Sequence, residues 1–289
     1  MGTSNMYTGP NRSPLLPPDF NDDDEGNSEN PNPQEKPGEE NKPSEKPQEN
    51  ESSPNEMSSN NPQYSSWRSA KNSMSKYASG KGGRNGKKNA VSNYVKGYGG
   101  SHNAAKSAKS AIRTTINIGD FFKGVSQKGI TQVLQERQIP IEDRKPKEIL
   151  NDIVNILAPT PNLNDDSVAR KALVNTMSIV YEKFDDENKD ITLLDSFDSD
   201  ITKMLITKYI ETFIYERLIH DVGSRIEKKA ENSNSAAKIE KELKDYIESK
   251  VSTTLKDKPL SIISSDTKNV YMLVEGLYQK CYKVLEDQL

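Results

Sequence analysis

The sequence contains very little cysteine and histidine. Cys281 is the single cysteine, and His102 and His220 are the two histidines among 289 residues. One cysteine excludes an intramolecular disulfide framework, and two histidines in different parts of the chain give no zinc-ligand spacing. We therefore expect no metal and no other cofactor. The low cysteine content also fits a reducing compartment, the cytoplasm.

The sequence also lacks a long apolar run. It has no stretch of about 18 apolar residues that could span a bilayer, and its N-terminus lacks the basic-then-apolar order of a secretion signal. The myristoylation pattern M-G-x-x-x-[ST] fails because Met6 stands where serine or threonine is needed. These absences predict a protein without a membrane partner.

Apolar residues are scarce as well, and the charges are unevenly distributed. Hydrophobic residues make up 32% of the chain and charged residues 29%. Between Asp19 and Glu56 there are 13 acidic residues against three lysines, together with six prolines. From Met57 to Gly119 there are 11 lysines and arginines and no acidic residue. The overall net charge of −3 is therefore a balance between blocks of opposite sign.

These shifts in composition divide the chain into four zones. Residues 1–18 form a recognition segment, 19–62 an acidic Pro/Glu/Asn-rich tether, 63–111 a basic Gly/Ser/Asn-rich linker, and 112–289 an α-helical domain. The acidic zone cannot bury enough apolar surface to offset an ordering cost of roughly 1–2 kcal/mol per residue. The predicted fold class is all-α: a C-terminal helical bundle preceded by a long disordered, low-complexity N-terminal region.

Five amphipathic stripes predict the main helices of this domain. They cover residues 149–157, 168–184, 201–226, 239–251 and 270–285. The stripe over 201–226 is apolar around more than half of its circumference, which predicts a position at the centre of the bundle. One or two short helices are expected over 112–134, where three glycines interrupt the pattern.

Acidic residues and a proline predict where several of these helices begin and end. Asp198 or Asp200 is expected to cap the central helix, and Asp266 the last one. The first stripe should end at Ala158, because the residue before a proline disfavours helical geometry.

Three local patterns resemble parts of catalytic sites, and each has a simpler interpretation. Glu216 and His220 lie four residues apart on one helix face, a spacing more typical of a surface or interhelical polar pair. The stretch GKGGRNGKK over 80–88 lacks the glycine and Ser/Thr positions of a phosphate-binding loop, which favours a flexible basic linker. Adjacent acids are expected to be solvated caps: Asp22 to Asp24, Asp165 with Asp166, and Asp185 with Asp186. The chain is therefore predicted not to be an enzyme, with no catalytic residue.

The basic zone also contains aromatic residues, and this combination allows a nucleic-acid interpretation. Positive side chains contact phosphates, and aromatic rings stack on the bases of a single strand. The candidate contacts are Lys81, Arg84, Lys87 and Lys88, and the interleaved rings are those of Tyr64, Trp67, Tyr77, Tyr94 and Tyr98. The alternative is that the basic zone binds the acidic tether or an acidic partner protein.

The N-terminus offers a different kind of site. Initiator methionine is normally removed before a residue as small as glycine, so the mature chain is expected to start at Gly2 with a free α-amine. With a pKa of about 8 this amine is partly neutral near neutral pH, and the neutral form is a nucleophile. Thr3 and Ser4 could hydrogen-bond the walls of a narrow pocket. A stiff, locally apolar segment suited to a groove follows, made of Ser13, Pro14, Leu15, Leu16, Pro17 and Pro18. On these residues alone, an ordinary disordered end is the other interpretation.

Two motifs are similar to those of a known family. The opening MGTS, followed by SPLLPP at 13–18 and an acidic stretch, resembles QatB proteins of the bacterial Qat anti-phage defence system. The block YGGSHNAAKSAKSAIRTTINIGDFFKGV, residues 98–125, is similar to that family's Y-x-GGS-x-NA block ahead of a helical domain. Where the family often has tryptophan after the paired prolines, this chain has Asp19 and Phe20, so the aromatic anchor is either Phe20 or missing.

The resemblance implies an operon that also encodes an ATPase, a QueC-like enzyme (QatC type) and a TatD-like nuclease. QueC-like enzymes activate a deazaguanine carboxylate with ATP and offer it to a nitrogen nucleophile. The resulting hypothesis is that this chain is a protein substrate and adaptor of the QueC-like enzyme, which modifies or recognises Gly2. A tether of about 62 residues would span roughly 40–50 Å, enough to cross an enzyme subunit.

Two rival hypotheses remain at this stage. In the first, the chain is a nucleic-acid-binding adaptor that presents phage nucleic acid to the nuclease through its basic zone. In the second, the helical domain holds an unrecognised active site, for which the sequence offers no nucleophile–base pair.

Overall fold

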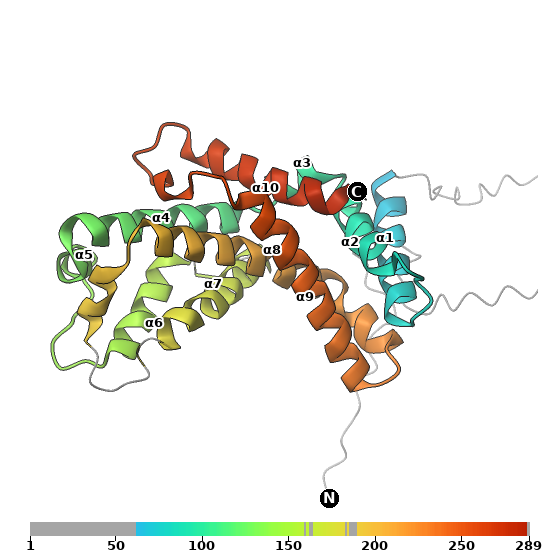
Figure 1. Cartoon of the computed structure of the whole chain (residues 1–289), viewed down its shortest axis with the longest axis horizontal. Helices are drawn as coiled ribbons and strands as arrows, with labels where there is room; N and C mark the ends of the chain where they lie inside the picture. Colours follow the sequence, from blue (N-terminus) through green and yellow to red (C-terminus); the bar gives the residue numbers. More distant parts are fainter. Residues whose placement is uncertain (1–61, 159, 162–163, 183, 185–189, 288–289) are drawn as a thin grey trace, which may run out of the picture. The chain divides into compact units, whose positions relative to one another are not determined.

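The computed structural model describes residues 62–158, 160–161, 164–182, 184 and 190–287. Over these residues the chain forms ten α-helices and two short 3-10 helices, and no strand (Figure 1). The predicted all-α fold class is confirmed. The recognition segment, almost the whole acidic tether and the pair Asp185 and Asp186 lie outside the described residues.

The long helix α8 (Ser199–Lys229) is the central element of the fold. Asp198 caps its N-terminus by accepting hydrogen bonds from the backbone N–H groups of Asp200 and Ile201, as the sequence predicts. Phe213 and Leu218 on this helix are fully buried. The helices that pack against α8 are α1 (Pro62–Ala78), α4 (Lys109–Lys128), α7 (Asn164–Glu182) and α9 (Ser233–Leu255). The predicted central position is therefore confirmed.

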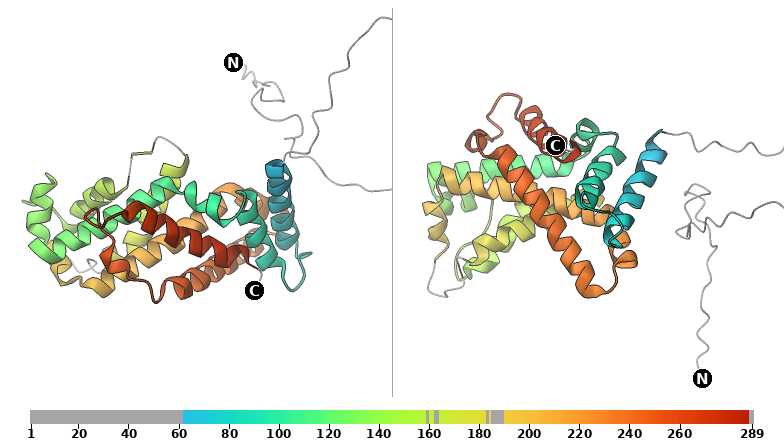
Figure 2. Two further views of the ribbon diagram at one scale, coloured as in Figure 1. Left: turned by 90° about the horizontal axis from the view of Figure 1, so that it is seen from above. Right: turned by 45° about the vertical axis from the view of Figure 1, so that its right-hand side comes forward.

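The remaining helices surround this centre. They are α2 (Gly86–Gly97), α3 (Ser101–Lys106), α5 (Ile130–Glu136), α6 (Pro146–Leu157), α10 (Val270–Glu286) and the 3-10 helices η1 (Ile191–Ser196) and η2 (Leu260–Ile262). Figure 2 shows α10 running beside α3, with which it packs closely. One continuous core joins these elements, from Met74 in α1 to Leu285 in α10.

Some helix boundaries match the sequence-based expectations. α6 ends at Leu157 with Ala158 as its C-cap, and α9 begins after Asn232, whose side chain accepts a hydrogen bond from the backbone N–H of Ser235. The expected capping of α10 by Asp266 is wrong. Asn269 occupies that N-cap position, while Asp266 forms an ion pair with Lys123, with 3.1 Å between Oδ2 and Nζ.

The helix α4 is longer than the sequence predicts. It runs through Gly119 and Gly124 for 20 residues and ends only at Gly129, whose φ of 82° breaks the helix. Gly119 is needed for close packing rather than for a turn, because a Cβ there would lie 2.0 Å from the carbonyl oxygen of Ile263. A glycine inside a helix can thus mark the close approach of another chain segment.

The structure also differs from the flexible basic linker expected over 63–111. This stretch forms α1, α2 and α3, and the first of these packs against α8. Small and apolar side chains at four-residue spacing form its inner face, namely Ala70, Met74 and Ala78. The glycines that look like linker residues serve the turn between α1 and α2, where Gly80 and Gly83 have φ values of 72° and 63°. The sequence-based boundary at residue 112 is therefore not a boundary between folded and linker regions.

Candidate functional site

The family-like block at residues 98–125 forms a joint between α2, α3 and α10. Gly99 and Gly100 have φ values of 84° and 95°, which side chains with a Cβ rarely adopt. At Gly100 a Cβ would also lie 3.1 Å from the Oε1 atom of Glu286. The backbone N–H of Ser101 donates to the Oε2 atom of the same carboxylate at 3.2 Å, so α10 supplies the N-terminal cap of α3. The two glycines are thus required by the local backbone.

Arg217 of α8 is buried beneath this joint, with only 7% of its surface exposed. Its guanidinium donates to the carbonyl oxygen of Ala104 and to the Oγ atom of Ser107, both at 3.0 Å. It also lies over the ring of Tyr98, with 4.3 Å between Cζ and the ring centroid. A buried guanidinium must find such partners, because an unpaired buried charge is costly. Arg217 therefore fixes α3 to the central helix.

Three aromatic rings complete the region. Trp67 packs edge-to-face on Tyr98, with 5.1 Å between the ring centroids, and Tyr94 packs edge-to-face on both. The hydroxyls of Tyr94 and Tyr98 donate to the same Oδ2 atom of Asp221 on α8, at 3.0 and 2.5 Å. Burial is the main cause that raises the pKa of both tyrosines above the ordinary value. These rings face one another inside the protein, so they do not form the exposed platform that base stacking requires.

The candidate nucleic-acid contacts surround the turn between α1 and α2. Lys81 and Arg84 are exposed, whereas Lys87 and Lys88 are half-buried. The Lys87 ammonium lies 5.7 Å from the centroid of the Tyr246 ring of α9, within cation–π distance. The structure thus brings the four cations near one turn and leaves two of them exposed to solvent.

Glu216 and His220 do not contact each other as a functional pair. The Glu216 carboxylate is buried and accepts hydrogen bonds or an ion pair from Asn175 and Lys171 of α7, both at 2.8 Å. His220 is instead paired through Nδ1 with Oδ1 of Asp221, at 3.0 Å. The interpretation of Glu216 as an interhelical polar group is confirmed.

The expectation that Asp165 and Asp166 are solvated caps is wrong. Asp166 is buried, and its carboxylate accepts a hydrogen bond from the Ser110 hydroxyl. Asp165 accepts from the backbone N–H of Ser110 at 3.0 Å and lies 4.0 Å from the Arg217 guanidinium. The two acids lie in the first turn of α7 and hold the N-terminus of α4, which is a tertiary contact between residues far apart in the sequence.

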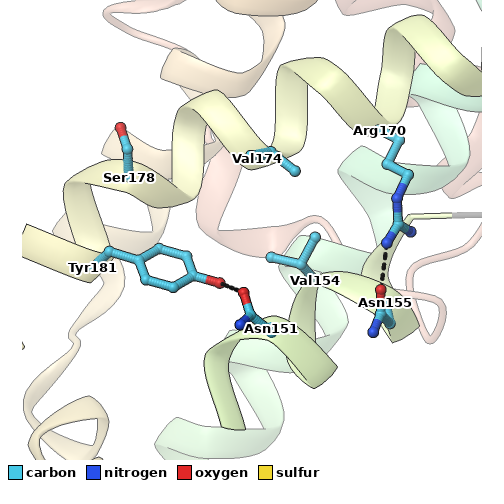
Figure 3. A pocket seen from close by; sticks show the side chains of 7 residues that line it. All are labelled: Asn151, Val154, Asn155, Arg170, Val174, Ser178 and Tyr181. Atoms are coloured by element: carbon cyan, nitrogen blue, oxygen red, sulfur yellow. Dashed lines mark hydrogen bonds between the residues drawn. The ribbon is translucent and has the colours of Figure 1, made fainter. Parts of the chain in front are cut away.

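A shallow groove between α6 and α7 is the largest cavity found in the described part of the chain, with a volume of about 490 Å³. Figure 3 shows its polar side chains pairing across the groove, with Tyr181 donating to Asn151 and Arg170 donating to Asn155. The side chains of Val154 and Val174 lie between these two pairs. None of the residues that line it was predicted as functional.

Two further properties of the described residues bear on function. No three histidine, cysteine, aspartate or glutamate side chains gather there as they would around a metal ion. Among the helices of the same residues, none combines the length and the apolar character needed to cross a bilayer. The remaining predicted site residues, Gly2, Thr3, Ser4 and 13–18, lie outside the described residues.

Sequence reasoning missed the two charged residues that organise this region, Arg217 and Asp221. Both lie on the helix predicted to be the most buried, and a charged residue on the inner face of such a helix must have a buried partner. That conflict was the available signal. The partners could not be named, because they lie about a hundred residues away in the sequence.

An all-helical protein whose buried charges join helices together, with a GGS-x-NA joint at the start of its family-like region, belongs to the class of associated proteins rather than to a recognisable catalytic fold. Residues 99–285 match the family described as Qat anti-phage system associated protein QatB. The match covers more than half of the chain, so this chain belongs to the QatB family. Neither the curated proteins nor the solved structures provide a match.

The matched range includes nearly all of the block at 98–125 and excludes the opening MGTS and the SPLLPP segment. The resemblance based on the block is thus confirmed. The resemblance based on the N-terminal motifs stays a prediction.

Proposed function

We propose that this chain is a non-enzymatic component of the Qat system that serves as a protein substrate and adaptor for the QueC-like enzyme, which recognises or modifies Gly2. The observation that carries the proposal is the QatB family match over residues 99–285. The N-terminal sequence supports the choice of residue, because glycine leaves the α-amine sterically accessible and Thr3 and Ser4 are small.

The proposed reaction is an acyl transfer to the α-amine of Gly2. The QueC-like enzyme would use ATP to convert a deazaguanine carboxylate into an acyl adenylate. The neutral amine attacks the acyl carbon, a C–N amide bond forms, and the C–O bond to AMP breaks. The proton lost by the nitrogen passes to a base of the enzyme or to water. This chain contributes only the nucleophile, whose pKa of about 8 leaves part of it neutral near neutral pH.

The helical part of the chain acts in this proposal as the docking body. Its buried charged residues support such a role, because Arg217, Glu216 and Asp165 all bind other helices of the same chain. Docking through the helices would raise the effective concentration of Gly2 at the enzyme. The segment 13–18 would add recognition of an apolar, proline-rich stretch in a groove.

Substitution of Gly2 tests the proposal directly. Gly2→Leu keeps the initiator methionine in place and adds a bulky side chain, so it should abolish protection against phage. Thr8→Ala, outside the proposed recognition residues, is the matched control and should protect as well as the parent. Full protection by Gly2→Leu at equal protein level would overturn the proposal.

A nucleic-acid-binding adaptor is the second candidate function. The observation that favours it is the exposure of Lys81 and Arg84 at one turn, within a stretch of sequence that has no acidic residue. Because the nearby aromatic rings are internal, such binding would rely on phosphate contacts. Replacing Lys81, Arg84, Lys87 and Lys88 by glutamine should then abolish defence and lower the salt dependence of binding by about 0.7 to 0.9 per lost contact. Unchanged protection by this variant would exclude the second candidate.

A further inference from the structure

A second groove lies between η2 and α10, on the opposite side of α10 from its buried residues. Its volume is about 360 Å³, and Leu260, Leu273 and Leu277 contribute to its lining. Leu260 and Leu277 are buried, whereas Leu273 is half-buried. The groove therefore has an apolar floor that the chain itself does not cover.

Large apolar side chains beside this floor are exposed. Met272 lines the groove and is 70% exposed, the highest value among the exposed large apolar residues of the described chain. Ile262 of η2, next to the lining residues in sequence, is 47% exposed. Exposed apolar residues gathered at one place, rather than scattered singly, mark interaction sites on soluble proteins.

Gly276 gives an independent reason to expect an occupant. It lies in the interior of α10, where glycine is less favourable than alanine by about 1 kcal/mol. The packing of this chain does not require a glycine here, since a Cβ at this position would meet no atom within 4 Å. Gly119 is the opposite case, because there a neighbouring carbonyl leaves no space for a Cβ. An element from outside the chain would account for Gly276.

The geometry of the groove fits a helix. Met272, Gly276 and Lys280 are spaced by four residues, so they follow one face of α10 over about 12 Å. A glycine in the middle of such a face lets a second helix approach closely, while the residues one turn away flank it. Helices of this kind dock with apolar residues at i, i+3, i+4 and i+7.

The charges of the groove define the other face of the occupant. The two charged residues among those lining it are Lys258 and Lys280. An occupant with acidic residues next to its apolar stripe would be complementary to both lysines.

We propose that the groove between η2 and α10 docks an amphipathic, acidic α-helix of another protein of the Qat system. The apolar stripe of that helix rests on Met272 and the leucine floor beside Gly276, and its acidic residues face Lys258 and Lys280. This inference rests on the family membership and not on a reaction at Gly2. The two proposals can therefore fail separately.

Filling the groove is the first test. Gly276→Leu in the full chain places a side chain in the groove where nothing clashes, so the melting temperature should equal or exceed that of the parent. Binding to the purified companion proteins of the system should fall at least tenfold. Gln279→Leu, an exposed position of α10 outside the groove, is the matched control and should bind as the parent does. Parent-like binding by a folded Gly276→Leu variant would overturn the proposal.

Site-specific crosslinking identifies the occupant. A photo-reactive amino acid at Met272 of the full chain, co-expressed with the other proteins of the system, should crosslink to an acidic helical segment of one of them. Lys258→Glu combined with Lys280→Glu should reduce the yield severalfold. The proposal would be wrong if the crosslink joined two copies of this chain, formed within one chain, did not exceed that from position 279, or kept its yield after the charge reversal.

Discussion

Replacing Arg217 by methionine should destabilise the protein and loosen α3 in particular. Methionine fills a similar length of the buried channel, but it cannot donate hydrogen bonds to Ala104 or Ser107. The substitution also removes the cation from the ring of Tyr98 and leaves Asp165 without the positive charge 4.0 Å away.

The size of the effect follows from these contacts. Removing one partner of a buried charged network costs about 3–5 kcal/mol, and the partial exposure of Asp165 favours the lower end of that range. A loss of about 3 kcal/mol corresponds to a fall in melting temperature of roughly 6–12 °C for a folded region of this size.

Thermal unfolding followed by circular dichroism measures this change. Arg113→Met is the matched control, because Arg113 is exposed on α4 and its replacement should cost less than about 0.5 kcal/mol. Hydrogen exchange should show faster opening at α3 than at α8 in the Arg217→Met protein. A fall in melting temperature no larger than that of the control would refute the role given to Arg217.

Two further predictions concern packing and pH. Gly119→Ala should cost at least about 2 kcal/mol in urea unfolding, because its Cβ would lie 2.0 Å from the Ile263 carbonyl oxygen, and Gly124→Ala should cost less, since its nearest neighbour is a side-chain methyl at 3.3 Å; equal costs would contradict this assignment. Burial raises the pKa of Glu211 from 4.5 to about 7 despite Lys208 at 3.6 Å. The unfolded state therefore ionises first as pH rises, and the free energy of unfolding should fall between about pH 4.5 and 7 and then level off. Glu211→Gln should remove that fall, so a pH-independent difference between variant and parent would disprove the assignment.

The long helices could be predicted because their apolar residues recur at helical spacing over many turns. α8 and α9 are examples, since Asp198 and Asn232 also announce their starts through side-chain caps. Local signals of this kind are contained within one segment of sequence, so no knowledge of the partner helix is needed.

The helices α1 and α2 were missed because their inner faces are small and their outer faces are rich in serine, asparagine and lysine. Ala70, Met74 and Ala78 are spaced correctly for a helix, but alanine gives a weak hydropathy signal. The adjacent glycines then favoured a linker, although they belong to one turn.

The contacts that hold α3 and α4 could not be predicted from sequence. Glu286 caps α3 and Asp165 caps α4, so each cap comes from a helix distant in the chain. Arg217 likewise finds its acceptors more than a hundred residues upstream. Such partners are determined by the packing of helices, which a local pattern does not contain.

The correction over 63–111 changes the proposed arrangement of the molecule. The folded region begins at α1 rather than near residue 112, so a truncated protein starting at 112 would lose α1, α2 and α3 together with the contacts to Arg217 and Asp221. Tests of docking should therefore keep the chain from Pro62 onward.

Intact-mass spectrometry of this protein, purified from cells that express the complete defence operon and resist phage, tests the central claim most directly. The account predicts that the methionine is absent and that an added acyl group maps to the N-terminal peptide beginning with Gly2, and that this group is missing when the QueC-like enzyme is inactivated. An unmodified Gly2 in cells that are fully protected would contradict the substrate role.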